Sequence, residues 1–347
     1  MPSLIRLTDI QAAAARISGV AVRTGLYPVE PERLRAAGVA DLPFALLVKA
    51  ESEQPIGSFK LRGAYNRIAQ LSAEELGRGV ITYSSGNHAQ GVAYAARALG
   101  SKAVIVMPEN APEIKIEATR ALGAEVVFVG PASSARKAKA EELAAAHGYT
   151  IIPPYDDPAI IAGQGTCGLE IVEQLGISAE GAAAGGVVIL SPVSGGGLLS
   201  GIATAVKLAA PGAAVEVWGA EPELAADAKE SFDTKTLVEW PAAKTTRTIS
   251  DGLRTQSVGV LNFEHILRFV DGIVTVSEDE ILAAMRVMLA ATGLVAEPSG
   301  AVTLAAALFH HGELPRCERM VAVLSGGNIE PELRRELDAG AATVASA

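Results

Sequence analysis

From about Val80 onward, short runs of β-branched residues alternate with longer segments whose apolar residues recur at helical spacing. The predicted strands of this first series span residues 79–83, 103–107, 125–129 and 150–152. The predicted helices span residues 91–99, 112–122 and 134–147, and Gly100, Gly123 and Gly148 stand where each helix should stop. Such a succession of strands and helices predicts βαβ units in a parallel sheet.

A second series of the same kind begins near Gly163. Its predicted helices span residues 163–175, 198–209, 278–291, 299–309 and 331–337, and its strands span 187–190, 215–220, 272–276 and 320–324. Residues 181–186 are expected to form a glycine and alanine linker, and residues 228–246 a polar surface excursion. The fold class is therefore predicted as α/β, with two open twisted, mostly parallel sheets and helices on both faces. A ligand should bind in the crevice outside the carboxyl ends of the strands.

Composition narrows the class of protein. At 347 residues the chain is long enough for two domains. Its formal charge of −10, without a concentrated basic run, argues against nucleic-acid and anionic-membrane partners. Cys167 and Cys317 are the only cysteines and lack zinc-ligand spacing, so we expect a reducing cytoplasm. Residues 1–15 do not have the pattern of a secretory signal, and no apolar stretch reaches membrane-spanning length, so we expect a soluble protein.

Lys60 is the leading candidate for chemistry. Gly57 and Ser58 allow a turn before it, Phe59 supplies an apolar wall, and the apolar residues that follow are spaced as in a helix. Lys60 would then lie in the first turn of that helix, where the helix dipole and an apolar pocket both disfavour an ammonium group. A lowered amine pKa favours imine formation with an aldehyde. The alternative is an ordinary solvated lysine.

A glycine-rich turn, Ser194-Gly195-Gly196-Gly197-Leu198, separates a predicted strand from a predicted helix. Its backbone amides and the helix N-terminus can converge on a phosphate. The alternatives are a tight connection that binds nothing, or a dinucleotide fingerprint in which Ser200 replaces the third glycine and Glu221 follows about twenty residues later. A nicotinamide oxidoreductase is therefore the rival from a different class, although it leaves Lys60 unexplained.

Two further polar turns follow predicted strands. Ser84-Ser85-Gly86-Asn87-His88 brings hydroxyl, amide and helix N-terminal donors to a place where a substrate carboxylate can dock. Ser325-Gly326-Gly327-Asn328 places a hydroxyl where it can bond a pyridine nitrogen. For both turns the simpler alternative is helix capping by a serine or an asparagine.

Taken together, six motifs resemble, in order, those of the fold-type II pyridoxal-phosphate enzymes, whose fold is that of the tryptophan synthase β chain. The resemblance is to the threonine/serine dehydratase and serine racemase branch and runs from about Thr8 to Leu337. The motifs are Gly57-Ser58-Phe59-Lys60-x-Arg62-Gly63, residues 84–88, the turn at 195–197, Gly219-x-Glu221-Pro222, Glu297-Pro298-Ser299-Gly300 and residues 325–328.

The resemblance implies a role for each matched residue. Lys60 carries pyridoxal 5'-phosphate as a Schiff base beside Phe59, Asn87 bonds the cofactor's phenolic oxygen, and Ser325 bonds its pyridine nitrogen. Residues 194–198 (Ser194, Gly195, Gly196, Gly197 and Leu198) bind its phosphate. The implied reaction is β-elimination, the dehydration and deamination of a hydroxy-amino acid such as L-threonine or L-serine to a 2-oxo acid and ammonia, with Lys60 as the base.

The substrate side of the site is implied in the same way. Ser84, Ser85, Gly86, Asn87 and His88 would bind the amino acid. Ser85 matches the second acid/base of serine racemases, which raises racemisation as an alternative. Arg136 matches a position that can reach a second substrate carboxylate and raises 3-hydroxyaspartate dehydration as another alternative. A solvated helix cation would also explain Arg136.

The resemblance further implies a divalent-cation site, a domain division and a homodimer. Glu221, Ala225 and Asp227 match a magnesium or calcium site of two carboxylates and a carbonyl, although acids at a helix start are commonly solvated. Residues 1–78 and 156–347 would form a large cofactor domain, and residues 79–155 a small mobile substrate domain.

The sequence departs from the family pattern at three positions. Ile56 stands where threonine is usual, and Ser194 replaces the first glycine of the phosphate loop. Tyr155 stands where racemases carry asparagine and many dehydratases carry phenylalanine. The residue at 155 favours an eliminase over a dedicated racemase.

Overall fold

The computed structural model describes residues 3–84, 86–109, 111, 113–130, 133–178 and 185–344. The strands are β1 (Leu26–Pro28), β2 (Ala45–Ala50), β3 (Val80–Tyr83), β4 (Ala103–Pro108), β5 (Glu125–Val129), β6 (Thr150–Ile151), β7 (Val187–Pro192), β8 (Val215–Pro222), β9 (Gly272–Val276) and β10 (Arg319–Leu324). The longer helices are α1 (Leu7–Ile17), α3 (Lys60–Ile68), α5 (Asn87–Ala98), α6 (Glu113–Ala121), α7 (Ser133–His147), α8 (Pro158–Leu175), α9 (Gly197–Ala209), α10 (Asp227–Thr234), α12 (Val260–Phe269), α13 (Glu278–Thr292), α14 (Pro298–Phe309) and α15 (Pro331–Val344). Shorter turns of helix are α2 (Pro31–Ala36), α4 (Ala73–Arg78), α11 (Ala242–Thr245), η1 (Glu51–Glu53), η2 (Glu223–Ala225) and η3 (Asp251–Leu253).

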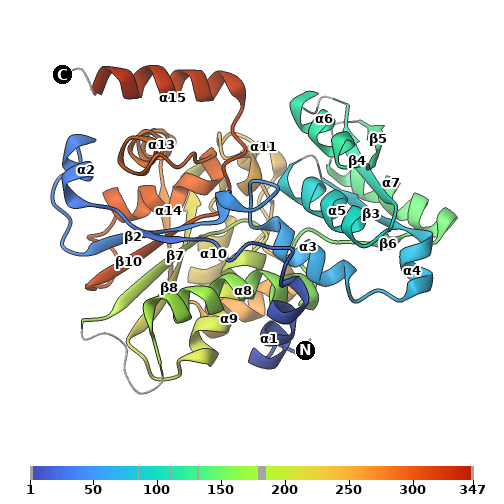
Figure 1. Ribbon diagram of the computed structural model, residues 1–347, viewed down its shortest axis with the longest axis horizontal. Helices are drawn as coiled ribbons and strands as arrows, with labels where there is room; N and C mark the ends of the chain where they lie inside the picture. Colours follow the sequence, from blue (N-terminus) through green and yellow to red (C-terminus); the bar gives the residue numbers. More distant parts are fainter. Residues whose placement is uncertain are drawn as a thin grey trace.

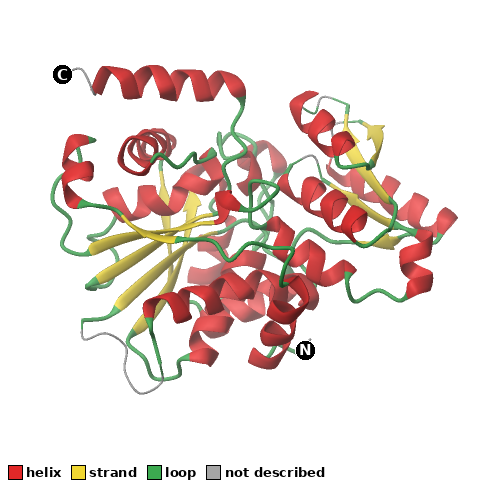
Figure 2. Cartoon of the chain, in the orientation of Figure 1, coloured by secondary structure: helices red, strands yellow, loops and turns green. Residues whose placement is uncertain are grey.

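The larger sheet has the strand order β1-β2-β10-β7-β8-β9 and is parallel except for β1. Helices cover both of its faces (Figures 1 and 2). Along β7, Val188 and Leu190 join the core under α13 and α14, whereas Val187 and Ile189 join the core under α8 and α9. Burial on both faces explains why these strands are continuous apolar runs and do not alternate with polar residues.

The smaller sheet is parallel throughout, with the order β5-β4-β3-β6. With its helices it forms the right-hand part of the molecule in Figure 1. Ile105 and Met107 of β4 pack in the core that holds α3 and α5, and Val104 and Val106 pack toward α7. The sheet is made from one continuous segment, residues 80–151, and the larger sheet is made from the chain on either side of it. The domain boundaries at 78/79 and 155/156 remain a prediction.

Both predicted strand series and the α/β class are confirmed, with small shifts at element ends. Gly100, Gly123 and Gly148 have φ values of +69°, +88° and +72°, in the left-handed region expected of helix stops. The sequence pattern predicts no strand before residue 79, yet β1 and β2 lie there. Both stand outside the regular alternation of strands and helices that begins near Val80.

One helix boundary differs from the expectation. Helix α8 begins at Pro158 and not at 163, because the Asp157 carboxylate accepts from the backbone amides of Ala159 and Ile160 and caps the helix. The expected surface excursion at 228–246 contains most of α10 and all of α11. Most of the expected linker at 181–186 lies outside the described residues. Within the part of the chain that the structure describes, no helix combines the length and apolar character needed to cross a membrane.

Candidate active site

Lys60 is the first residue of α3, as its sequence context predicts. The preceding Gly57 has φ +70°, and the Lys60 amine lies 5.0 Å from the centre of the Phe59 ring. Its Nζ donates to the carbonyl of Pro154 at 2.9 Å. Burial lowers the pKa of the Lys60 amine to about 8, and the Glu297 carboxylate opposes this shift. A neutral, nucleophilic amine is therefore accessible near physiological pH.

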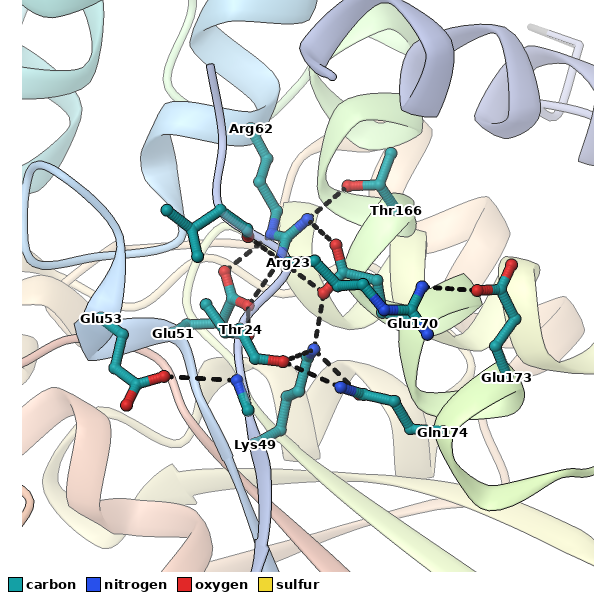
Figure 3. Close-up of polar contacts among 12 residues, drawn as sticks. Arg23, Thr24, Lys49, Glu51, Glu53, Arg62, Thr166, Glu170, Glu173 and Gln174 are labelled. Carbon is teal, nitrogen blue, oxygen red and sulfur yellow. Dashed lines mark hydrogen bonds and ion pairs between the residues drawn. The ribbon is translucent and has the colours of Figure 1, made fainter. Parts of the chain in front are cut away.

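Helix α3 is held on its other side by a buried charge network, shown in Figure 3. The guanidinium of Arg62 donates to both oxygens of Glu51 (2.7 and 2.8 Å) and to both oxygens of Glu170 (2.7 and 2.9 Å). Lys49 Nζ donates to Glu170 at 2.6 Å and to the carbonyl of Thr24 at 2.9 Å. Two positive and two negative groups are thus paired across four segments. Because Arg62 lies two residues after Lys60, this network limits rotation of α3 and so fixes where Lys60 points.

The turns after β3 and β10 meet beside Lys60. Asn87 is the first residue of α5, and its Nδ2 donates to Glu297 Oε1 at 2.6 Å. Asn328 Nδ2 donates to Asn87 Oδ1 at 2.7 Å and to the Ile56 carbonyl at 2.9 Å. Ser325 is buried, and its carbonyl accepts from the Phe59 amide at 3.0 Å. The structure therefore brings Asn87, Ser325 and Lys60 together. The Asn87 side chain does not cap α5, so the alternative that it serves only as a helix cap is wrong.

The remaining residues of the 84–88 turn have different environments. The Ser84 hydroxyl accepts from the Gly86 amide at 3.4 Å, and Gly86 is the N-cap of α5. His88 is buried and its Nε2 lies 3.1 Å from the Ile152 carbonyl, so Nε2 carries the proton. Burial lowers the pKa of His88 to about 3, with a smaller effect from Lys60, and the imidazole is neutral. Ser85, the candidate second acid/base, lies outside the described residues.

The turn after β7 has the geometry expected of an anion site. Gly196 has φ +93°, and no side chain caps the start of α9, so the first amides of the helix face the turn. The Ser194 hydroxyl lies 3.0 Å from that of Thr255. The ring of Tyr155 packs directly against the turn: a Cβ added to Gly195 would lie 2.2 Å from the nearest ring carbon. Position 195 must therefore be glycine because a side chain there would collide with Tyr155, and a glycine also lets the backbone approach a phosphate closely. Leu198 is buried in the core behind the turn.

Glu221 and Asp227 lie at the carboxyl end of β8 and the start of α10. Glu221 accepts from the amides of Ala228 (3.3 Å) and Lys229 (2.6 Å), whereas Asp227 Oδ2 is buried and has no hydrogen-bond partner. Burial raises the pKa of Asp227 to about 7; burial and then Asp227 raise that of Glu221 well above its ordinary value. Ala225 is buried beside them.

Arg136 lies on α7, against the smaller sheet, and is half-buried. Burial lowers the pKa of its guanidinium. The description of a fully solvated helix cation therefore does not fit this side chain.

Sequence reasoning missed two residues of the site. Glu297 and Asn328 were recognised as parts of motifs but were given no role. One sequence feature sets Glu297 apart: it directly precedes a helix that begins with proline, a position where Ser, Thr, Asp or Asn is the usual cap. Its partner Asn87 is 210 residues away, and only the folded structure shows the contact.

Comparison with known proteins gives one family. The family model described as pyridoxal-phosphate dependent enzyme matches residues 26–326. The chain is 39% identical over 282 residues to an L-threo-3-hydroxyaspartate ammonia-lyase of Saccharomyces cerevisiae, covering 81% of this chain and 82% of that protein. It is 38% identical to a serine racemase of Schizosaccharomyces pombe, covering 93% and 94%. The crystal structure of a threonine deaminase from T.th. matches with a TM-score of 0.83 and 43% identity, covering 94% of this chain and 99% of that one. The chain therefore belongs to the family of pyridoxal-phosphate-dependent enzymes.

Proposed function

We propose that this enzyme dehydrates and deaminates a hydroxy-amino acid such as L-threonine or L-serine, releasing a 2-oxo acid and ammonia. The observation that carries the proposal is the position of the half-buried Lys60 amine, which starts α3 between the Phe59 ring and the Pro154 carbonyl and lies beside Asn87 and Ser325. The similarity to an ammonia-lyase and to a threonine deaminase supports this reaction class over others in the family.

The residues present fit pyridoxal phosphate. Lys60 would hold its aldehyde carbon, the turn 194–198 its phosphate, Asn87 its phenolic oxygen and Ser325 its ring nitrogen. The uncapped start of α9 suits the phosphate, and the wall of Phe59 suits the ring. When bound, the cofactor supplies an electron sink that makes the α-proton of the amino acid acidic.

The side chains of this enzyme then perform three tasks. The hydroxyl of Ser84 and the first amides of α5 bind and orient the substrate carboxylate. The neutral Lys60 amine removes the proton from the substrate α-carbon. The electron pair left on the α-carbon forms a double bond to the β-carbon, and the bond from the β-carbon to its hydroxyl breaks. The Lys60 ammonium returns its proton to the hydroxyl, which leaves as water. The released enamine tautomerises to an imine, which water hydrolyses to the 2-oxo acid and ammonia.

The test is to measure 2-oxo acid and ammonia release from L-threonine, L-serine, D-serine and the 3-hydroxyaspartate isomers, with and without added pyridoxal phosphate. Cofactor-dependent release from one or more of them is expected, together with a borohydride-trapped adduct on Lys60. An adduct elsewhere, or no turnover of any of these substrates, would overturn the proposal.

A nicotinamide oxidoreductase is disfavoured by the geometry of Glu221. Ribose recognition requires a carboxylate free at the strand end, but Glu221 is buried and both its oxygens accept from backbone amides. That rival predicts a colourless protein that nicotinamide cofactors stabilise against heat, whereas the proposed enzyme should be yellow.

3-Hydroxyaspartate is a second candidate substrate, favoured by the half-buried guanidinium of Arg136 and by the similarity to an ammonia-lyase for this amino acid. We expect Arg136→Gln to reduce kcat/KM for the dicarboxylate by about tenfold to a hundredfold, while L-serine turnover changes little. Equal losses for both substrates would show that Arg136 does not read the second carboxylate. Racemisation through Ser85 is the other alternative, and chiral analysis of residual serine during turnover tests it.

A divalent cation, magnesium or calcium, is proposed at Glu221, Asp227 and the Ala225 carbonyl. The unpartnered Asp227 oxygen and the raised pKa values of both carboxyls are what a cation would relieve. Among the described residues, no group of three or more His, Cys, Asp or Glu side chains is placed to hold a metal. The site would therefore need the carbonyl and water to complete its coordination.

We also propose a homodimer in a cytoplasmic setting, with residues 79–155 as a mobile substrate domain. Cys167 and Cys317 are free thiols, as a reducing compartment would maintain. Light scattering after size exclusion tests the dimer, cell fractionation tests the compartment, and X-ray scattering with and without substrate tests domain movement.

A further inference from the structure

Glu297 is the N-cap residue of α14, but its carboxylate makes no capping bond to that helix. The side chain is 5% exposed and accepts from Asn87 Nδ2 at 2.6 Å. Asn87 begins α5 of the smaller sheet, while α14 packs on the larger one. This bond therefore joins the parts of the molecule that carry the two sheets, beside Lys60.

The structure leaves room for this carboxylate. A Cβ added to Gly326 would lie 2.1 Å from Glu297 Oε1 and 3.2 Å from Asn87 Nδ2. The backbone amide of Glu297 also donates to the Gly326 carbonyl at 3.1 Å. Any side chain at 326 would displace the Glu297 carboxylate from Asn87. The hydrogen bond between Glu297 and Asn87 therefore depends on a glycine at position 326.

The donor and the acceptor of each hydrogen bond around Asn87 can be assigned in one way only. The Ile56 carbonyl can only accept, so the Asn328 atom facing it is the nitrogen. That nitrogen also faces Asn87, whose atom there must be the oxygen, and the Asn87 nitrogen must then face Glu297. Glu297 completes the chain as an acceptor. This chain of hydrogen bonds does not use the second hydrogen of the Asn87 nitrogen, which would be the donor to the cofactor's phenolic oxygen when the cofactor is bound.

Charged groups face Glu297 from three elements: Lys60 of α3, Lys115 of α6 and Asp251 of η3. Lys115 forms an ion pair with Asp251, and the Gly252 amide of η3 donates to the Ser299 hydroxyl of α14 at 2.9 Å. Burial, and then Asp251, raise the pKa of Glu297 to about 8, while Asn87, Lys115 and Lys60 act in the opposite direction. Glu297 raises the pKa of Lys60 and Lys60 lowers the pKa of Glu297, so the charge of one affects the other.

We propose that Glu297 is a positioning residue of the active site, which holds the amide of Asn87 in one orientation through its 2.6 Å hydrogen bond and whose negative charge favours the ammonium form of the neighbouring Lys60. The inference deepens the proposed function, because it assigns Asn87 and Lys60 to the cofactor. Ionised Glu297 stabilises the ammonium form of Lys60, and removal of its charge releases the free amine at lower pH.

The test measures the amine itself in the apoprotein. Competitive acetylation of Lys60 with acetic anhydride is followed against pH by peptide mass spectrometry, with the exposed Lys137 as internal reference. Glu297→Gln keeps the shape and loses the charge, so the Lys60 midpoint should move to lower pH by about one unit. Glu332→Gln removes the same charge from an exposed position and should leave the midpoint unchanged.

A second variant, Asp251→Asn, should shift the Lys60 midpoint in the opposite direction. Asp251 raises the pKa of Glu297, so Asp251→Asn should leave Glu297 more ionised and move the Lys60 midpoint to higher pH. The double variant should behave like Glu297→Gln alone, because Asp251 acts through Glu297. Asp251 is 40% exposed, so this substitution is tolerated even if changes at 297 impair folding. An unchanged midpoint in Glu297→Gln, or equal shifts in both single variants, would overturn the inference.

The orientation of Asn87 is tested by cofactor affinity. A glutamine at 297 still offers an oxygen to Asn87, whereas alanine does not. The dissociation constant of pyridoxal phosphate should therefore rise by about tenfold in Glu297→Ala and change less than about threefold in Glu297→Gln. Equal losses would show a packing role only. If no substrate is turned over but these shifts occur, the proposed reaction fails and the role of Glu297 stands.

Discussion

Two glutamates, Glu51 and Glu297, lie equally deep in this protein but behave in opposite ways. Burial would raise the pKa of Glu51, but Arg62 overcomes it and holds the pKa below its ordinary value. At Glu297 the nearest partner is the neutral amide of Asn87, and burial raises the pKa to about 8. The charged form of the first carboxylate is therefore favoured, whereas the charged form of the second is disfavoured.

The two glutamates differ in how completely the charges around them are paired. Arg62, Lys49, Glu51 and Glu170 balance two charges of each sign, with bidentate bonds and short distances (Figure 3). The active site leaves Lys60, Glu297 and Asp227 only partly compensated. Full pairing gives a rigid support, whereas partial pairing gives groups that can change charge during a reaction.

The largest expected effect is the loss of catalysis in Lys60→Met. Activity should fall on the order of 10⁴-fold or more, because the variant lacks the amine that is proposed to hold the cofactor and to act as the base. Stability should be retained, since a buried, partly compensated charge is removed. Turnover and thermal unfolding of the apoprotein measure the two effects. Residual activity above about 1% of wild type would contradict the role of Lys60.

Next in size is the loss of stability in Arg62→Met. Its removal leaves Glu51 and Glu170 with one cation between them, and the unfolding free energy should fall by about 3–5 kcal/mol in urea titration. Adding Glu51→Gln removes the surplus charge and should recover part of that loss. If the double variant is no more stable than the single one, packing and not charge holds this region.

A smaller effect is expected from pH and divalent cations at Asp227. Its folded pKa of about 7 exceeds its ordinary value of 3.8, so its contribution to stability is present at acidic pH and is lost as pH rises through 7. Without cations, the Tm should therefore fall from pH 5 to pH 8. Magnesium or calcium should raise it by a few degrees at pH 8 and less at pH 5. Asp227→Asn should abolish the cation response, and EDTA provides the cation-free control.

The smallest effect is expected where a pair is exposed. Arg334 bonds both oxygens of Asp338 on α15, but the two side chains are 39% and 51% exposed. Arg334→Ala should change the unfolding free energy by less than about 1 kcal/mol, because solvent screens the pair. A loss comparable to that of Arg62→Met would mean that burial does not separate the two classes of ion pair.

Much of the fold was predictable, because β7 and β9 are short apolar runs, α13 has apolar residues at helical spacing, and α3 begins directly after the glycine turn. The candidate site was predictable as a set of motifs, including Lys60, Asn87 and the turn at 195–197. The role of Glu297 was not, because its unusual place before a proline-led helix start does not identify Asn87 as its partner. Tyr155 was recognised as unusual, but its position against Gly195 depends on how the chain returns from the smaller sheet.

The sequence by itself determined most of the helices and strands after residue 79 and the polar turns that end the strands, since the spacing of apolar residues and glycine conformation are local properties. The tertiary structure decided which charges are paired. Arg62 meets Glu170 across 108 residues, and Asn87 meets Glu297 across 210. A pKa depends on burial and on neighbours brought together by folding, so the titration of Lys60 and Glu297 follows only from their three-dimensional surroundings.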